Sequence, residues 1–323
     1  MLYQETDVSN ILKIIREKKF KSYYFLDHLF IDYLLKFNSS SNFRDKSFII
    51  KNDDSMILCP MTIQNKNGDK FLNFFGNPFI YICDKENKEI LNFFKLSIKK
   101  ILISENISDL NLLIEKSSSN FFEIKKYFNK ITNVKYINLS LEINAIRKGF
   151  NTGLKSRLNK YHQNLTYRII DHENYKNEIF EMKEMHKAVS QKVTRSMDTW
   201  LSNETMILNN KGFLIKVSDK KQVISYSFFF NSGEYSSYFS SCTYRDFFKI
   251  YKNITHKTIF EALKYLQNKN CKKLILGETK IVYSNLEITD KEKNICEFKS
   301  SFGGEKFTHY YLNKKSLDLV DLY

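Results

Sequence analysis

Short apolar segments separated by polar turns dominate the first half of the chain, and their lengths are typical of β-strands. Three strand-like segments come first, at residues 47–52, 55–64 and 70–82, with a turn at Asn67-Gly68. Apolar residues then recur at helical spacing from 88 to 104, and 109–116 is a further strand-like segment. This pattern predicts the order β-β-β-α-β. Residues 1–46 carry a series of apolar positions that favours helices.

The same order of elements recurs about 165 residues later along the chain. Strands are predicted at residues 212–217, 222–230 and 235–244, a helix at 255–267, and a closing strand at 272–277. A further helix is predicted at 177–191. Two similar α/β domains follow from this repetition, and we place their boundary between residues 145 and 146, which gives domains of residues 1–145 and 146–323.

The composition fits a compact fold and weakens the case for nucleic-acid binding. Of the 323 residues, 42% are hydrophobic, and two prolines and nine glycines exclude collagen-like or linker-rich chains. The formal net charge is +15, but only seven of the 51 basic residues are arginine, the residue that bidentate and stacking contacts favour. A solvated lysine surface is the first interpretation, an anionic small ligand the second and nucleic acid the third.

The cysteines and the N-terminus indicate a protein of the reducing cytoplasm. Five cysteines are widely spaced and include no Cys-x-x-Cys pair, so neither a disulfide framework nor a zinc site is expected. The N-terminal residues lack the apolar core of a signal peptide. No apolar run approaches the roughly 18 residues of a membrane span. We therefore expect a cytoplasmic chain with no membrane span and no metal.

Three segments resemble a known acyltransferase family. They are residues 146–149 with 155–158, the stretch MHKAVSQKVTRSMDTW at 185–200, and FKSSFGGE at 298–305. Together with the order of elements, they resemble the GNAT N-acyltransferase core and, within it, the double-domain FemAB-like branch. The resemblance covers most of residues 140–310, whereas the first half matches only in its order of elements. It implies an α/β (α+β) fold of two tandem GNAT-like domains, each a mixed, mostly antiparallel sheet flanked by helices.

The resemblance also implies a site for an acyl-coenzyme A donor, acetyl-CoA in the simplest case. In that fold pantetheine lies where two central strands separate, and pyrophosphate meets the N-terminus of the following helix. Here this region contains Arg245, Lys249 and Lys252, with Thr255 as the expected N-cap. The sequence departs from the simpler GNAT enzymes, since no glycine occurs between Gly233 and Gly277. A capped helix after a basic loop is the alternative.

The resemblance also implies that the 185–200 stretch lines the acceptor pocket. His186, Arg195, Asp198 and the sole tryptophan, Trp200, are candidates for binding a charged or hydroxylated acceptor. A structural histidine and a core tryptophan are the alternatives.

Further candidates come from the strands and from the last predicted turn. For the general base we favour Glu278, which follows a strand, over His256, whose pKa the helix dipole is expected to lower. Tyr226, Ser240 or Tyr283 could be a donor to the oxyanion, and Lys299 is expected to face the site, whereas Gly303-Gly304 is expected to form a turn.

A basic segment near the domain junction is a possible phosphate site. Arg147, Lys148 and Arg157 are interleaved with glycines there and could hold the phosphates of a nucleotide- or lipid-linked acceptor, or simply form a solvated helix face.

These features lead to one principal functional hypothesis and two rivals. The principal hypothesis is a GNAT/FemAB-like N-acyltransferase that moves an acyl group from acyl-CoA to an amino group, with an amino sugar of cell-surface polysaccharide as the preferred small-molecule acceptor. The first rival is an aminoacyltransferase of the peptidoglycan-bridge type that uses aminoacyl-tRNA. The second is a non-catalytic module that binds glycans or nucleotides.

Overall fold

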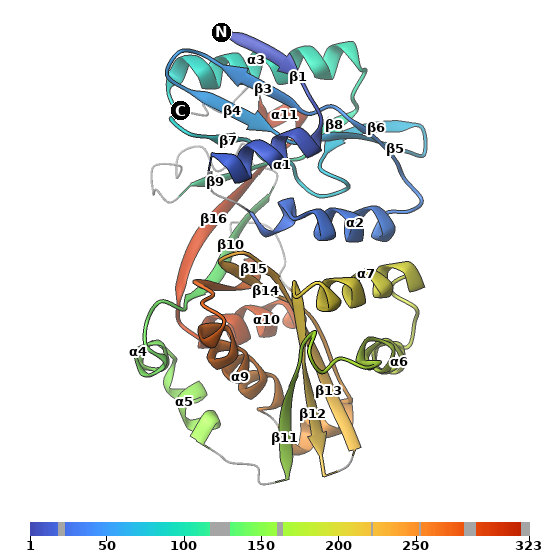
Figure 1. Cartoon of the computed structure of the whole chain (residues 1–323), viewed down its shortest axis with the longest axis vertical. Coiled ribbons are helices and arrows are strands. Elements are labelled where there is room, and N and C mark those ends of the chain that lie inside the picture. The colour runs from blue at the N-terminus through green and yellow to red at the C-terminus, as the bar shows by residue number, and fades with distance from the viewer. Residues whose placement is uncertain are drawn as a thin grey trace. The chain divides into compact units, whose positions relative to one another are not determined.

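The computed structural model describes residues 1–18, 23–116, 130–159, 164–220, 222–251, 253–280 and 289–317. The chain forms two compact units, residues 1–132 with 307–323, and residues 133–306 (Figure 1). This division differs from the predicted one because the last strand, β16 (Glu305–Leu312), pairs through Thr308–Leu312 with β9 (Leu112–Lys116) of the first unit. A domain boundary placed by sequence order alone assigns all of β16 to the second domain and does not take its pairing with β9 into account.

The first unit contains two four-stranded sheets with helices, and each sheet is mostly or entirely antiparallel. One sheet has the order β1-β3-β4-β7 and the other the order β2-β5-β6-β8. The strands are β1 (Leu2–Glu5), β2 (Asn42–Asp45), β3 (Phe48–Lys51), β4 (Met56–Cys59), β5 (Thr62–Lys66), β6 (Asp69–Asn73), β7 (Ile82–Cys83) and β8 (Asp109–Leu110). The helices are α1 (Val8–Glu17), η1 (Tyr24–Leu26), α2 (His28–Phe37), α3 (Lys88–Ser104) and α11 (Lys314–Leu317).

The predicted elements of this unit are right where apolar periodicity is strong. The predicted helix at 88–104 is confirmed as α3, whose N-cap Asn87 accepts a hydrogen bond from the amide of Ile90 at 2.9 Å. The predicted strand at 55–64 is wrong as one element, because Pro60 separates β4 from β5 and the two lie in different sheets. The predicted strand at 70–82 is likewise divided into β6 and β7.

The helical prediction for residues 1–46 holds for α1 and α2 and fails for β1 and β2. Both strands are short, with mostly exposed side chains, and lie first in the order of their sheets. Backbone pairing holds them: β1 pairs with β3 along Leu2–Glu5, and β2 pairs with β5 along Asn42–Asp45. Because such strands bury few side chains, they leave little apolar pattern in the sequence.

In the second unit the strands of a mixed sheet follow the order β11-β12-β13-β14-β15-β10, in which β11 to β14 are antiparallel and β14 pairs with β15 in parallel. Its strands are β10 (Lys130–Asn138), β11 (Leu165–Ile170), β12 (Gly212–Asp219), β13 (Gln222–Ser232), β14 (Tyr235–Thr243) and β15 (Lys273–Lys280). Its helices are α4 (Ile143–Lys148), α5 (Thr152–Asn159), α6 (Glu178–Ser190), α7 (Met197–Leu208), α8 (Arg245–Ile250), α9 (Ile254–Asn268) and α10 (Asp290–Ser301).

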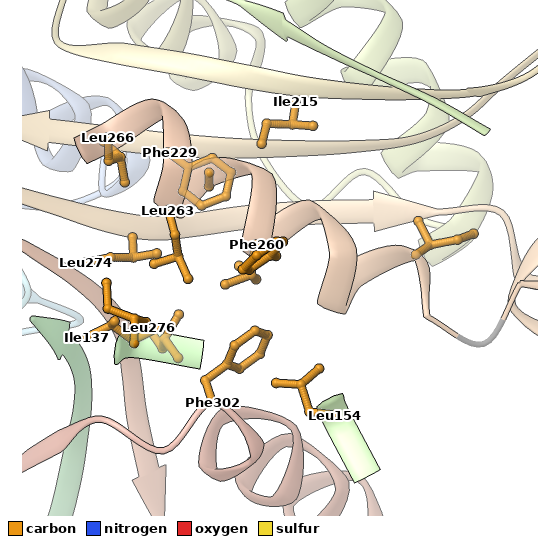
Figure 2. Close-up of a cluster of buried hydrophobic side chains, with 14 of the residues drawn as sticks. Ile137, Leu154, Ile215, Phe229, Phe260, Leu263, Leu266, Leu274, Leu276 and Phe302 are labelled. Carbon is orange, nitrogen blue, oxygen red and sulfur yellow. The ribbon is translucent and has the colours of Figure 1, made fainter. Parts of the chain in front are cut away.

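Helices cover both faces of this sheet (Figure 1). On one face Phe260, Leu263 and Leu266 of α9 pack with Phe229 of β13 and Leu274 of β15 (Figure 2). The other face contacts α6, where the thiol of Cys242 on β14 donates to a backbone carbonyl of the helix. The predicted elements at 177–191, 212–217, 222–230, 235–244, 255–267 and 272–277 are confirmed as α6, β12, β13, β14, α9 and β15.

The glycine pair after α10 fills a place where side chains do not fit. Gly303 has a φ of +60°, and a Cβ on it would lie 2.1 Å from the carbonyl oxygen of Gly149. Gly304 has a φ of +72°, and its Cβ would lie 2.4 Å from the carbonyl oxygen of Tyr136. The left-handed backbone and the close approach both require glycine. This pair therefore has the structural role that the sequence predicted for it.

Candidate active site

The central feature of the second unit is the point where β14 and β15 stop pairing. Their parallel ladder joins Tyr235–Ser237 to Lys273–Ile275, although β14 continues to Thr243 and β15 to Lys280. Beyond Ser237 and Ile275 the ladder does not continue, so the backbone groups of the two strands there are not paired with each other in it. Two adjacent parallel strands that separate in this way form a place for an extended chain between them.

A β-bulge lies at the same level on β14. Phe228 of β13 pairs with Ser240, and the next residue, Phe229, pairs with Tyr238, so Phe239 is the extra residue of the bulge. A bulge increases the local twist and redirects the side chains next to it. The bulge thus coincides with the region in which β14 departs from β15, and it gives the site a residue that sequence patterns did not show.

Glu278 and Lys299 lie together on the β15 side of the opening. Glu278 is half-buried on β15, three residues beyond the last ladder residue, and its carbonyl oxygen accepts a hydrogen bond from Lys299 Nζ at 2.6 Å. Burial lowers the pKa of Lys299, while nearby Cys296 and Glu278 raise it. Gly277 precedes them with a φ of +90°, and a Cβ there would lie 3.1 Å from Lys299 Nζ. The Lys299 ammonium is therefore held at the backbone of Glu278, beyond the end of the β14–β15 ladder.

His256 lies in the first turn of α9 and is buried among aromatic rings. Its ring centroid is 4.9 Å from that of Phe298 and 5.7 Å from that of Phe302, and its Nε2 lies 3.5 Å from a guanidinium nitrogen of Arg157. Burial, and secondarily Arg157, lower the pKa of His256 to about 4. The ring is neutral at pH 7, as predicted, but burial rather than the helix dipole is the main cause.

This buried histidine predicts a pH-dependent stability. In the unfolded chain the pKa returns to about 6.5, so between pH 6.5 and 4 the unfolded state binds a proton that the folded state excludes. Stability should therefore fall as the pH falls through this window, by about 2 kcal/mol at pH 5 relative to pH 7. We expect urea unfolding of His256→Gln to lose this part of the pH dependence.

The exposed residue His172 provides the matched control for this measurement. His172→Gln should keep the pH dependence of the wild-type chain. A His256→Gln variant whose stability between pH 7 and pH 5 changes as much as that of the wild type would contradict the assignment.

The start of α9 differs from the prediction by two residues. The helix begins at Ile254, so Asn253 is the N-cap and Thr255 lies within the first turn. The prediction of Thr255 as N-cap is therefore wrong. The side-chain amide of Asn253 donates to the carbonyl oxygen of Arg157 at 2.8 Å. This hydrogen bond anchors the N-terminus of α9 to α5. Asn253 is buried, and Thr255 is partly exposed.

The predicted phosphate contacts of the donor lie on a short helix before α9. Arg245 and Lys249 are both exposed on α8. Arg245 donates to the carbonyl oxygen of Val189 on α6 at 3.4 Å, and Lys249 lies 3.7 Å from the carboxylate of Asp246. Lys252, also predicted, lies outside the described residues. The two described cations are open to solvent and stay candidates for phosphate binding.

The predicted acceptor-phosphate residues do not all point to one place. Arg147 donates to the side chain of Asn159, which joins α4 to the end of α5. The carbonyl oxygen of Lys148 accepts a hydrogen bond from Lys155 Nζ at 2.7 Å. Arg157 is directed toward His256 instead. This arrangement joins the two short helices, and a phosphate site there stays a prediction.

The predicted acceptor residues gather around the connection between α6 and α7. Trp200 is buried in the first turn of α7, its ring centroid 5.6 Å from that of His186. The guanidinium carbon of Arg195 lies 5.1 Å from the Trp200 ring centroid. Burial, and secondarily Arg195, lower the pKa of His186. Asp198 is exposed in the first turn of α7, where a carboxylate stabilises the helix N-terminus.

Tyr226 has its own hydrogen-bond network on the α6 face of the sheet. Its hydroxyl donates to the carboxylate of Glu181, which also accepts a hydrogen bond from Lys216 Nζ at 2.8 Å. Burial, followed by the interaction with Glu181, raises the pKa of Tyr226, so the hydroxyl stays protonated. The Tyr226 hydroxyl therefore donates its hydrogen bond to Glu181 in this structure, and not to an oxyanion. Tyr283, the other tyrosine predicted as a donor, lies outside the described residues. Sequence reasoning missed Glu181, which precedes Tyr226 by 45 residues.

The described part of the chain contains no cluster of three or more His, Cys, Asp or Glu side chains that could hold a metal ion. Nor does any helix within the described ranges have the length and apolar character needed to cross a bilayer. The five cysteines are free thiols.

Solved structures share the fold of this chain at low sequence identity. FemX has a TM-score of 0.65 at 11% identity and covers 99% of this chain and 100% of its own. L-PGS from Bacillus licheniformis has a TM-score of 0.52 at 11% identity, with 95% and 92% covered. A tandem GNAT protein from the clavulanic acid biosynthesis pathway has a TM-score of 0.50 at 8% identity, with 97% and 98% covered. The chain has the tandem GNAT fold.

No family model matches the chain, and no curated protein matches its sequence. The fold that the sequence resemblance implied is nevertheless confirmed, with mixed, mostly antiparallel sheets flanked by helices. In this fold the second unit has the order β11-α6-α7-β12-β13-β14-α8-α9-β15-α10, and the β14–β15 ladder ends at Ser237 and Ile275. Sequence reasoning missed helix α7 and the bulge residue Phe239, because neither has a distinctive local pattern.

Proposed function

We propose that the chain is an N-acyltransferase that moves an acyl group from acyl-coenzyme A to the amino group of an amino sugar. The observation that carries this proposal is the end of the β14–β15 ladder at Ser237 and Ile275, in a chain with the tandem GNAT fold. Open backbone groups on two diverging strands suit the extended pantetheine arm, whose amides need hydrogen-bond partners. The fold alone does not determine chemistry, so the proposal also needs reacting groups near this opening.

Glu278 and Lys299 supply those groups. The amine of the acceptor attacks the thioester carbonyl, the new C–N bond forms as the C–S bond breaks, and one amine proton passes to the Glu278 carboxylate. The Lys299 ammonium, held next to the Glu278 carbonyl, stabilises the negative charge that develops on the thioester oxygen. The thiolate leaves and takes up a proton. This direct transfer needs no covalent intermediate on the enzyme.

The phosphates of the donor are assigned to the region of α8 and the start of α9. Arg245 and Lys249 present exposed cations there, and Thr255 lies in the first turn of α9, whose positive end favours anions. Asn253 and His256 are buried, so the approach of phosphate is expected on the Thr255 side of the turn.

A thermal-shift measurement followed by a transfer assay tests this function. Acetyl-CoA at 100 times its Kd should stabilise the native chain by about 2.7 kcal/mol. Pantetheine, which carries no phosphate, should stabilise the chain less at the same concentration. In the assay, acetyl-CoA and glucosamine should yield free thiol and N-acetylglucosamine. Release of thiol without acetylated sugar would contradict the acceptor assignment.

The rival functions give different results in the same experiment. Stabilisation by tRNA that falls steeply with salt, with none by acetyl-CoA, would indicate an aminoacyl-tRNA donor. Binding of sugars or nucleotides without turnover of any thioester would indicate a non-catalytic module. Either outcome would replace the acyl-CoA proposal.

A further inference from the structure

Two buried polar atoms near the β14 bulge have no hydrogen-bond partner in the part of the chain that the structure describes. They are Nη1 of Arg195 and Oγ of Ser240. The Arg195 guanidinium lies over two aromatic rings, 5.1 Å from the Trp200 centroid and 5.8 Å from the Phe239 centroid. An unsatisfied buried donor costs about 1–3 kcal/mol, and more when it is charged. Such atoms are expected to acquire a partner when a ligand binds.

Both atoms lie on the same face of the sheet. The thiol of Cys242 contacts Met182 of α6, which defines the α6 face of β14, and Ser240 precedes Cys242 by two residues. The bulge places Phe239 on this face as well, where it contacts Phe228 with a centroid distance of 5.9 Å. Arg195 reaches Phe239 from the connection between α6 and α7. The guanidinium and the hydroxyl therefore both lie near the bulge residue Phe239.

The charges around this place fit a ligand group with one negative charge. Arg195 contributes one permanent positive charge, and the lowered pKa of His186 keeps that ring neutral at pH 7. Ser240 contributes a neutral hydroxyl that can donate. The Arg195 guanidinium lies over the Trp200 and Phe239 rings, and the planar edge of a guanidinium matches the two oxygens of a carboxylate.

We propose that Arg195 and Ser240 bind a carboxylate of the acceptor, so that the acceptor is an amino sugar that also carries a carboxylate, an aminouronic acid. This inference rests on the proposed function for the amino group. Because Nη1 has no exposed surface, the connection of residues 191–196 must shift when the carboxylate enters. This connection is mostly exposed, and Val193 within it is 72% exposed.

Three sugars that differ only at C6 test the proposal by calorimetric titration without any acyl donor. They are glucosamine, 2-amino-2-deoxyglucuronic acid and glucosamine 6-phosphate, which carry a hydroxymethyl, a carboxylate and a phosphate ester. We expect the Kd of the aminouronic acid to be lower than that of glucosamine by about 10-fold or more, because the carboxylate forms a charge-assisted pair with Arg195. Arg195→Gln should remove this preference, and Ser240→Ala should reduce it by a few-fold.

Arg168→Gln is the matched control, because Arg168 is exposed on β11. It should leave the preference unchanged. Arg195→Lys keeps the charge without the planar fork and should retain only part of the preference. Circular dichroism of each variant establishes that it is folded. Equal binding of glucosamine and the aminouronic acid by the wild-type chain, or an undiminished preference in Arg195→Gln, would overturn the proposal. Tighter binding of glucosamine 6-phosphate would assign a phosphate instead.

Transfer assays separate this inference from the proposed function. Arg195-dependent binding of the aminouronic acid without acyl transfer to any sugar would overturn the proposed function and leave the carboxylate site standing. Acyl transfer with the same kcat/KM for glucosamine and the aminouronic acid would keep the function and overturn the carboxylate site.

Discussion

Glu278→Gln should lower the kcat of acyl transfer by 100-fold or more, with little change in the KM for acyl-CoA or in stability. Glu278 lies on β15 beyond the last residue that pairs with β14, and a positioned general base contributes about 10²–10⁴-fold. Glutamine has the same shape but cannot accept the amine proton. The backbone carbonyl that receives Lys299 is unchanged by the substitution, so the ammonium should stay in place.

Steady-state kinetics with acetyl-CoA and an amino sugar measures this effect. Glu234→Gln is the matched control, since Glu234 forms an exposed ion pair with Lys272 and should keep wild-type kcat. An unchanged kcat in Glu278→Gln would remove Glu278 as the base. His256→Gln then becomes the next variant to assay, and a large loss of kcat with retained folding would assign the base there.

Gly303→Ala should lower the free energy of unfolding of the second unit by about 3 kcal/mol or more. The left-handed conformation at φ +60° costs a non-glycine residue about 1–2 kcal/mol. The added Cβ would also lie 2.1 Å from the carbonyl oxygen of Gly149, a backbone atom that cannot rotate away. Relieving this overlap requires backbone shifts that cost about 1–3 kcal/mol.

Gly233→Ala separates the two contributions. Its φ of +57° is nearly the same, but a Cβ there meets no atom within 4 Å, so its cost should be about 1 kcal/mol. The sole tryptophan, Trp200, lies in this unit, so urea unfolding followed by its fluorescence reports on both variants. Equal losses in the two variants would show that the contact with Gly149 carries no energy.

The fold was predictable where apolar periodicity and turn residues are both strong. The helix at 88–104 and the strands at 212–243 match the structure within a few residues, because their buried faces require apolar side chains at fixed spacing. Strands β1 and β2 were not predictable in this way. Their stability comes from backbone pairing with other strands, which places no requirement on their own side chains.

The candidate site was predictable in its residue types and not in its pairings. Sequence reasoning selected Arg157 and His256 separately, as a phosphate contact and a base, yet the fold brings them together across 99 residues. It selected Tyr226 but not Glu181, its partner on the neighbouring helix. It recognised that Gly303 needs a permissive backbone, whereas the approach of Gly149 depends on tertiary packing that local patterns do not contain.

The return of β16 to β9 sets an order for folding during synthesis. Residues 133–306 form a contiguous unit, so all of its strands except the last part of β16 are available once residue 306 has left the ribosome. The first unit must wait for Thr308–Leu312 before β9 gains this partner. The unit that begins the chain is therefore the last to complete its hydrogen bonding, and until then β9 presents an unpaired edge.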